Sequence, residues 1–199
     1  MNRQRNALRF RVELRGISPL IWREILVPAR YSFWDLHVAV QDSMGWWDSH
    51  LHAFRPGRGG SRGGVEIGIP TDDDYTEVVA GWEVPVVEHF SEAGDRMLYE
   101  YDFGDSWEHD ITLLAIEHRI KGQKYPQCLA GERACPPEDC GGVPGYERLV
   151  AALLDPDDEE HDDLTEWIPE GWGPELFKPS RVRFDNPTRR WKRAFEESY

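Results

Sequence analysis

The stretch that organises this chain is Tyr99–Ile111, which reads Tyr-Glu-Tyr-Asp-Phe-Gly-Asp-Ser-Trp-Glu-His-Asp-Ile. Apolar and polar residues alternate on both sides of a Gly-Asp-Ser turn, which is typical of a β-hairpin. Successive side chains of a strand lie on opposite faces, so each arm has one apolar face. The residues predicted to face the core are Met97, Tyr99, Tyr101, Phe103, Trp107, His109, Ile111 and Leu113. The carboxylates at the turn are left as candidates for function.

Alternation elsewhere predicts further strands. Leu8–Leu14 alternates apolar residues with arginine and glutamate, and Ile21–Val27 is the predicted return strand of an N-terminal hairpin. Pro28 ends that strand because it has no N–H to donate to the ladder. Shorter strands are predicted over His50–Phe54 and Val65–Ile69.

A helix is predicted over Phe33–Met44. Apolar residues recur there at helical spacing, Ser32 and Asp35 form a capping-box pattern at its start, and Gly45 suits the position after its end. Further helices are predicted over Glu83–Ala93, over Pro144–Leu154 and from Asn186 onward. Arg119–Gly145 shows no periodicity, and such a long irregular loop is usually functional or held by other contacts.

Composition indicates a folded globular protein. The chain has 199 residues, of which 40% are hydrophobic and 12% aromatic, a richer apolar content than disordered chains carry. No run of about 18 apolar residues is present for a membrane span, and the first residues lack the apolar core of a signal peptide. We therefore expect a single domain over residues 1–199, a cytoplasmic location and no membrane partner.

Charge is unevenly distributed. The net charge is −14, yet residues 1–30 hold seven Arg against two Glu, and residues 178–199 hold seven Lys and Arg against three acids. The acidic body argues against a uniformly basic nucleic-acid binder, because it repels phosphate. Two interpretations of the basic termini stay open: ordinary solvated charge, or a patch that binds nucleic acid.

The segment 55–64 reads Arg-Pro-Gly-Arg-Gly-Gly-Ser-Arg-Gly-Gly and is predicted to be a flexible insertion, because so many glycines do not hold one conformation. Its arginines could contact phosphate, but it lacks the Gly-Lys-Ser/Thr ending of a P-loop. The pattern therefore indicates a loop rather than a phosphate site.

Histidines and cysteines supply candidate metal ligands. Two imidazoles separated by one residue share a strand face and can chelate a metal, and three cysteines fall close together in the irregular loop. The candidate ligands for zinc or another divalent cation are His50, His52, His109, Cys128, Cys135 and Cys140. The alternative is structural: histidines that line a sheet face or the core, and thiols that pack inside an ordered loop.

The hairpin turn and the Pro-Pro-Glu-Asp loop at 136–139 form the predicted recognition surface, since irregular segments with acidic and aromatic residues often bind partners. The candidate binding residues are Asp102, Asp105, Ser106, Trp107, Glu108, Glu138 and Asp139. Their carboxylates could also hold a divalent cation if the loop folds onto the turn. With 37 acids in the chain, chance clustering is the competing explanation.

Four motifs, in this order, resemble one family. They are Arg-Val-Glu-Leu-Arg-Gly-Ile-Ser-Pro-Leu-Ile-Trp-Arg, Phe-Trp-Asp-Leu-His-Val-Ala-Val-Gln-Asp-Ser-Met-Gly-Trp, Tyr-Asp-Phe-Gly-Asp-Ser-Trp-Glu-His and Cys-Pro-Pro-Glu-Asp-Cys-Gly-Gly. Over nearly its whole length the chain is similar to the Ri-plasmid ORF-three-like family, whose members are often labelled transposon or insertion-element passenger TnpR proteins. The resemblance implies an α+β fold, with a roll-like antiparallel β-sheet and packed helices. It also implies a link to plasmids and mobile elements, and a protein or nucleoprotein partner from such an element.

The TnpR label does not agree with the chemistry of a resolvase. A serine recombinase needs an activated serine among arginines near its N-terminus, whereas this chain has no serine before Ser18. Ser106 lacks the Gly-x-Ser-x-Gly context of an acyl-transfer nucleophile. Our main hypothesis is a non-enzymatic binding or accessory module, and nucleic-acid binding through the basic termini is a further alternative. The other alternative is a metal-dependent hydrolase or nuclease that uses His50, His52, Asp102, Asp105 and His109.

Overall fold

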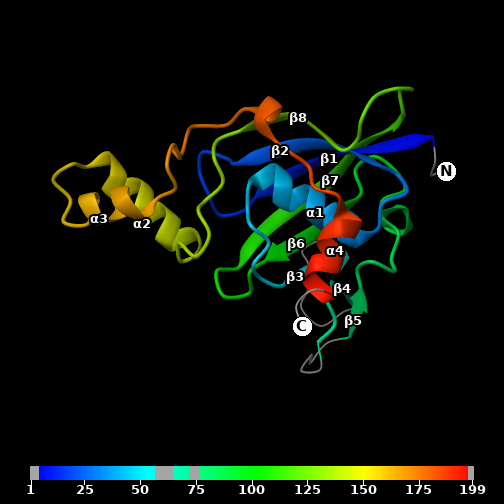
Figure 1. Cartoon of the computed structure of the whole chain (residues 1–199), viewed down its shortest axis with the longest axis horizontal. Coiled ribbons are helices and arrows are strands. Elements are labelled where there is room, and N and C mark those ends of the chain that lie inside the picture. Colours follow the sequence, from blue (N-terminus) through cyan, green and yellow to red (C-terminus); the bar gives the residue numbers. More distant parts are fainter. Residues whose placement is uncertain (1–4, 57–64, 72–76, 197–199) are drawn as a thin grey trace.

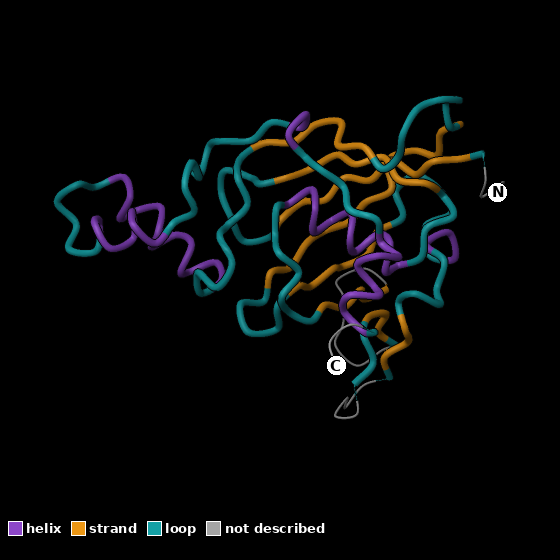
Figure 2. The backbone as a smooth tube through the Cα atoms, viewed as in Figure 1, coloured by secondary structure: helices purple, strands orange, loops and turns teal. Residues whose placement is uncertain are grey.

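The computed structural model describes residues 5–56, 65–71 and 77–196. Within them, one eight-stranded sheet with strand order β5-β4-β3-β6-β7-β1-β2-β8 forms the body of the molecule (Figures 1 and 2). Neighbouring strands are antiparallel except β4 and β5, which pair in parallel. The strands are β1 Asn6–Leu14, β2 Trp22–Pro28, β3 His52–Pro56, β4 Glu66–Gly68, β5 Val78–Ala80, β6 Arg96–Tyr101, β7 Trp107–His118 and β8 Gln127–Glu132. The predicted α+β class with an antiparallel sheet is confirmed.

Helices α1 and α4 lie next to each other over one face of the sheet, while α2 and α3 project together from one end of the molecule (Figure 1). The helices are α1 Phe33–Met44, α2 Gly142–Leu154, α3 His161–Trp167 and α4 Pro187–Phe195, with 3-10 turns η1 Val86–Glu88 and η2 Pro179–Arg181. In the part of the chain that the structure describes, none of the helices has the length and apolar character needed to cross a bilayer.

The alternation in β1 decides which face of the sheet is the core. Leu8, Phe10, Val12 and Leu14 are fully buried beneath the α1 side of the sheet, while the charged residues between them stay half-exposed. Burying an aliphatic or aromatic side chain of this size contributes about 1.5–3 kcal/mol relative to leaving it exposed. The alternation therefore determines which face of β1 is buried, whichever strands it pairs with.

Helix α1 has the predicted bounds because both of its ends are capped locally. The hydroxyl of Ser32 accepts a hydrogen bond from the backbone N–H of Asp35, and the Asp35 carboxylate accepts one from the Ser32 N–H, at 3.2 and 3.0 Å. Gly45 ends the helix at φ +100°, a left-handed conformation that favours glycine. The capping box and the C-cap are confirmed.

The predicted helix over Glu83–Ala93 is wrong, since only the 3-10 turn η1 forms there. The carbonyl of Val84 accepts a hydrogen bond from the N–H of Phe33 at 3.0 Å, and Pro85 forms an isolated bridge with Ser32. These contacts hold Val84 and Pro85 beside the start of α1, and only a short 3-10 turn follows, so the helical spacing of the apolar residues reflects their burial rather than an α-helix.

Strand β8 lies in the segment that was predicted to be irregular. It is an edge strand paired only with β2, and the register shifts between Glu24 and Ile25. A strand with this irregularity and half-exposed residues on both faces shows no period of two. Phe103 is also misassigned: it is 48% exposed because Asp102, at φ +58°, ends β6 before it.

The first two residues of the predicted flexible insertion at 55–64 belong to a strand. Arg55 and Pro56 belong to β3, and the Arg55 guanidinium is buried between the carboxylates of Glu66 and Glu100. Residues 57–64 lie outside the described residues. Arg55 was interpreted as part of a loop because it opens a glycine-rich run. The two carboxylates that neutralise it come from other strands and are distant in the sequence.

Candidate functional site

The segment 135–142 folds back onto the β6–β7 turn. The backbone N–H of Gly141 donates a hydrogen bond to Oδ2 of Asp105 at 3.1 Å. Gly142, at φ +67°, approaches so closely that a Cβ atom there would lie 2.7 Å from the carbonyl oxygen of Asp105. The loop and the turn are therefore in direct contact, the condition on which the predicted recognition surface depended.

Glu138 anchors the loop from the other side. Its Oε1 accepts hydrogen bonds from the backbone N–H of Trp47 at 2.7 Å and from the hydroxyl of Tyr101 at 3.1 Å. Burial raises the pKa of the Glu138 carboxyl, against the lowering effect of these donors. The indole N–H of Trp46 donates to the carbonyl of Pro136 at 3.0 Å. Side chains of β6 and of the segment after α1 thus fix the loop.

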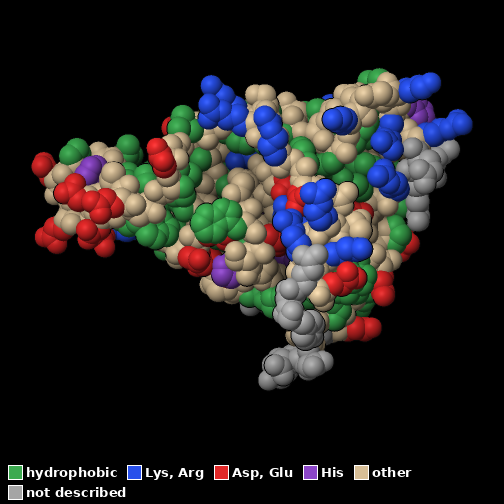
Figure 3. All heavy atoms as spheres, viewed as in Figure 1, with side chains coloured by type: hydrophobic (Ala, Val, Ile, Leu, Met, Phe, Trp, Pro, Cys, Tyr) green, Lys and Arg blue, Asp and Glu red, His purple; other side chains and the backbone are tan. Residues whose placement is uncertain are grey.

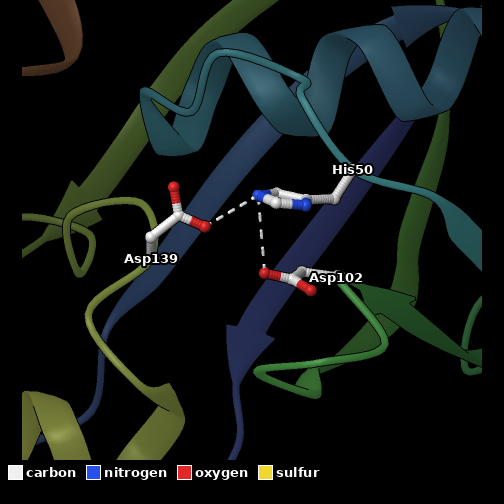
Figure 4. Close-up of side chains that lie close together, drawn as sticks. All are labelled: His50, Asp102 and Asp139. Atoms are coloured by element: carbon white, nitrogen blue, oxygen red, sulfur yellow. Dashed lines mark ion pairs between the residues drawn. The ribbon is translucent and has the colours of Figure 1, made fainter.

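Between turn and loop, three side chains from separate segments meet at one point (Figure 4). Nε2 of His50 lies 3.0 Å from Oδ1 of Asp139 and 3.6 Å from Oδ2 of Asp102. One ligand atom of each residue lies within 4.8 Å of the others. His50 follows α1, Asp102 opens the hairpin turn and Asp139 belongs to the loop before α2, so only the fold assembles them.

Backbone hydrogen bonds orient the Asp102 carboxylate. Its Oδ1 accepts hydrogen bonds from the backbone N–H groups of Gly104 and Asp105 at 2.9 and 3.3 Å, which leaves Oδ2 toward His50. Asp102 and Asp139 both have positive φ, at +58° and +57°. Aspartate tolerates this region better than most residues, and backbone strain of this kind concentrates at functional sites.

The geometry at His50 suits a cation between the three groups. Although Nε2 lies within ion-pair distance of Asp139, it is buried and makes no direct hydrogen bond within the described residues. In a simple histidine–carboxylate pair the N–H would be directed at an oxygen. Ligand atoms of a tetrahedral zinc site, about 2.0–2.2 Å from the metal, lie roughly 3.3–3.5 Å apart. Separations of 3.0 and 3.6 Å bracket that value.

The other predicted histidine ligands lie in the core. His52 is 3% exposed and stacks on His37 with ring centroids 3.5 Å apart. His109 is fully buried against Trp46 and Tyr99. Burial lowers the pKa of His52 well below its usual value and that of His109 to about 3, so both rings are neutral. The structure does not bring either ring to the His50 cluster, which corrects the predicted His50–His52 pair.

Among the described residues the three cysteines also join no group that could hold a metal. Cys135 is buried, while Cys128 lies on β8 and Cys140 at the start of α2. Burial raises the pKa of the Cys128 thiol to about 11 and that of Cys140 to about 12. Because the thiols do not come together with other ligands among the described residues, the alternative of thiols packed in an ordered loop describes them better.

Three of the candidate binding residues lie away from the cluster. Trp107 is 1% exposed and belongs to the core. Glu108 pairs with Arg15 at 3.2 Å on the opposite face of the hairpin. The Ser106 hydroxyl donates to Glu100 at 3.1 Å rather than to a histidine. Trp107 faces the core and Glu108 the other face of β7, whereas the positive φ of Asp102 lets its carboxylate lie beside His50.

Sequence reasoning missed a cavity of about 470 Å³ beside the loop. Its lining residues include Arg23, Trp46, Trp47, Trp172 and Phe177, together with Glu138. Arg23 could have been found from the sequence: in β2 it occupies an inward position between Ile21 and Ile25. A charged residue on the apolar face of an alternating strand requires an explanation.

Comparison with known proteins agrees with the motifs. The family model described as plasmid pRiA4b ORF-3-like protein matches residues 6–181. The uncharacterised protein y4hQ of Sinorhizobium fredii is 32% identical over 163 residues, which cover 81% of this chain and 80% of that protein. The crystal structure of the protein of unknown function MM3350 from Methanosarcina mazei superposes with a TM-score of 0.80 at 38% identity, covering 90% of this chain and 99% of that one. The chain belongs to the plasmid pRiA4b ORF-3-like family.

Proposed function

We propose that this chain is a non-enzymatic binding module of a plasmid or mobile element, with its recognition surface at the β6–β7 turn and the loop 135–142. The single observation that carries the proposal is the docking of this loop on the turn. Exposed side chains gather there: Trp47 is 77% exposed and Phe103 48%, and the Asp139 side chain is 71% exposed. Accessible aromatic residues beside charges are common anchors of protein interfaces.

A divalent cation held by His50, Asp102 and Asp139 would fix the loop to the turn and shape this surface. One imidazole and two carboxylates suit zinc or manganese better than calcium, which prefers oxygen ligands. The cation would neutralise two carboxylates that otherwise repel each other. Recognition would then depend on metal because the surface depends on the position of the loop.

Purified protein is expected to bind one zinc or manganese ion per chain, and His50→Ala to weaken that binding by more than about 100-fold. Loss of a residue that only orients a ligand typically costs 10–100-fold, and His50 supplies the only nitrogen of the cluster. Isothermal titration calorimetry on protein stripped with a chelator measures both affinities.

Glu108→Gln is the matched control for that titration. It removes a carboxylate of the same hairpin that pairs with Arg15 and lies outside the cluster, so metal affinity should not change. A wild-type chain that takes up neither zinc, manganese nor magnesium, or an unchanged affinity in His50→Ala, would show that the cluster is an ordinary ion pair.

For the recognition surface itself, we expect Phe103→Ala and Asp139→Arg to lose a partner that the wild-type chain retains in pull-down from cells carrying the element. Both residues are exposed, so circular dichroism should show an unchanged fold. Ile120→Ala, at an exposed position on the β7–β8 connection, is the control. If both variants keep every wild-type partner, the surface lies elsewhere.

A metal-dependent hydrolase is the second candidate, because three protein ligands leave coordination positions open for water and substrate. The carboxylates best placed to act as a general base are already engaged: Asp105 accepts from Gly141, and Glu138 from Trp47 and Tyr101. Metal-loaded protein should therefore fail to hydrolyse bis(4-nitrophenyl) phosphate. Turnover that His50→Ala abolishes would favour the hydrolase instead.

Nucleic-acid binding through the basic termini has less support. Lys and Arg side chains do gather on part of the face shown in Figure 3, and carboxylates crowd the α2–α3 end. However, Arg190 of α4 pairs with Asp42 at 2.6 Å and with Asp48 at 3.5 Å. One of the C-terminal basic residues therefore holds α4 against the rest of the fold and is not available to bind phosphate. An electrophoretic mobility shift of a nucleic acid by the protein at low salt would support this alternative.

A further inference from the structure

Arg23 lines a cavity that shares Trp47 with the proposed recognition surface and Asp139 with the metal cluster, but Arg23 itself belongs to neither. The cavity lies between the end of α1, the segment 134–139 and the segment 167–177, and its volume of about 470 Å³ is in the range of small-molecule sites. Tryptophan side chains and other apolar groups make up most of its wall.

The Arg23 guanidinium is fully buried, yet part of its hydrogen-bonding capacity is unused. Nε donates to the carbonyl of Ser43 at 2.8 Å, and Nη1 donates to the carbonyls of Trp22 and Glu132 at 2.7 and 2.9 Å. Nη2 has no hydrogen-bond partner within the described residues. Three of the five N–H donors are therefore satisfied, and the two on Nη2 are not.

The positive charge of Arg23 is also uncompensated. No carboxylate of the described residues forms a salt bridge with it, in contrast to the buried Arg55. Burial lowers the pKa of Arg23, which measures the cost of keeping this charge away from water. Buried charges are normally paired, because an isolated ion loses its solvation. The partial negative charges of three carbonyls and the face of the Phe177 ring, 3.6 Å away, stand in for a counter-ion.

Arg23 itself lines the cavity. Nη2 shares one edge of the planar group with Nε, and Nε is directed at the last turn of α1 through Ser43. Met44 and Gly45, the next residues along that turn, line the cavity together with Arg23. The unused donor is thus adjacent to apolar space of ligand size.

A second hollow of about 670 Å³ adjoins the first and shares lining residues with it, among them Met44, Trp172 and Phe177. Its own wall carries basic side chains. These are Lys178, Arg181 and Arg183; the wall also holds Asp42 and Glu175, whose carboxylates pair with Arg190 and Arg133. Basic groups beside the cavity raise the local concentration of anions. At the opposite end, Glu138 and Asp139 disfavour a second negative charge.

We propose that this cavity binds a small amphipathic carboxylate, with one anionic head on Nη2 of Arg23 and an apolar body among the aromatic side chains of the wall. A carboxylate supplies acceptors for both unused N–H donors and compensates the buried charge. Because Phe177 covers the guanidinium, binding displaces its ring, which lies on an irregular segment and is only half-buried.

Three probes of the same shape test the head group: 3-phenylpropionate, 3-phenylpropanamide and 3-phenylpropylamine. We expect saturable quenching of tryptophan fluorescence by the carboxylate, at least 10-fold weaker binding of the amide and no binding of the amine. Arg23→Gln should abolish the preference for the carboxylate. Equal affinities for the three probes, or no saturation by the carboxylate at millimolar concentration, would overturn the proposal and leave ordered water as the partner of Nη2.

Variants of the exposed residue Leu176 test the same site if Arg23→Gln fails to fold. Its side chain lines the cavity and is 61% exposed, so its substitution should leave the fold intact. Relative to Leu176→Gln, we expect Leu176→Lys to strengthen binding of 3-phenylpropionate several-fold and Leu176→Glu to weaken it by a similar factor. Identical affinities in these three variants would contradict the site. The metal titration changes His50, whereas the ligand titration changes Arg23 or Leu176, so either proposal can fail alone.

Discussion

Replacing Arg55 by Met is expected to lower the free energy of unfolding by about 3–5 kcal/mol, the usual cost of removing one partner from a buried ion pair. The Arg55 side chain is 7% exposed and lies between two carboxylates that are 10% and 1% exposed, those of Glu66 and Glu100. Nε donates to Glu66 at 2.7 Å, and Nη1 donates to Glu100. Without the guanidinium, two negative charges remain in the interior of the sheet, and their repulsion adds to the cost of burial.

Urea unfolding, followed by tryptophan fluorescence, measures this loss as a lower midpoint at an unchanged slope. Arg15→Met is the matched control: Arg15 also contacts two carboxylates, Asp110 at 2.7 Å and Glu108 at 3.2 Å, but all three side chains are about one-third exposed. Exposed pairs contribute only about 0–1 kcal/mol. If the two substitutions lower the midpoint equally, burial of the Arg55 group does not set its contribution.

Acidification from pH 6.5 to 5 is expected to destabilise the fold, with a slope for each of two buried histidines that rises from about 0.7 to about 1.4 kcal/mol per pH unit. Burial lowers the pKa of His52 well below 6.5 and that of His109 to about 3. In this pH range the unfolded chain therefore binds protons at these two histidines and the folded chain does not. The histidine contribution to stability is complete above pH 6.5 and is lost as the pH falls toward the folded-state pKa.

The surroundings of His52 explain why it stays neutral. Its ring stacks on that of His37, which contacts the Tyr99 hydroxyl at 2.8 Å and Asp48 at 2.7 Å. A proton on His52 would have to be accommodated without water and against the neighbouring imidazole, and only Asp48 favours it. Protonation is thus coupled to opening of the core beneath α1.

Denaturant titrations at closely spaced pH values measure the slope. His52→Phe keeps an aromatic ring in the stack but cannot take up a proton, so about half of the slope between pH 6.5 and 5 should disappear. His118→Gln, at the exposed end of β7, should leave the slope unchanged. A His52→Phe slope equal to that of the wild-type chain would mean that other groups govern the acid response.

Secondary structure could be predicted wherever the signal is local. The ends of α1 depend on Ser32, Asp35 and Gly45, which lie within one turn of the helix that they cap. The inward face of β1 depends only on alternation. Prediction was wrong where a distant contact decides the conformation. β8 pairs with β2 across an irregular register, and the start of α1 holds Val84 and Pro85 in a non-helical conformation.

The candidate site shows the same division. His50, Asp102 and Asp139 were each recognised as chemically suitable, but as members of larger sets that included buried His52 and His109. Sequence alone could not separate them, because burial depends on which face of which strand is covered. Glu108 was misplaced for a related reason: its carboxylate lies across the sheet from the turn that redirects Asp102.

The sequence by itself determined the α+β class, the hairpin Tyr99–Ile111, the capped helix α1 and the family, since all of these follow from periodicity, caps and motifs within short windows. Only the tertiary structure decided that the loop 135–142 docks on the turn, that three distant side chains meet there, and that Nη2 of Arg23 has no hydrogen-bond partner in the described part of the chain. The physical reason is that hydrogen bonding, desolvation and charge pairing depend on neighbours in space, which for these groups come from segments far apart in the chain.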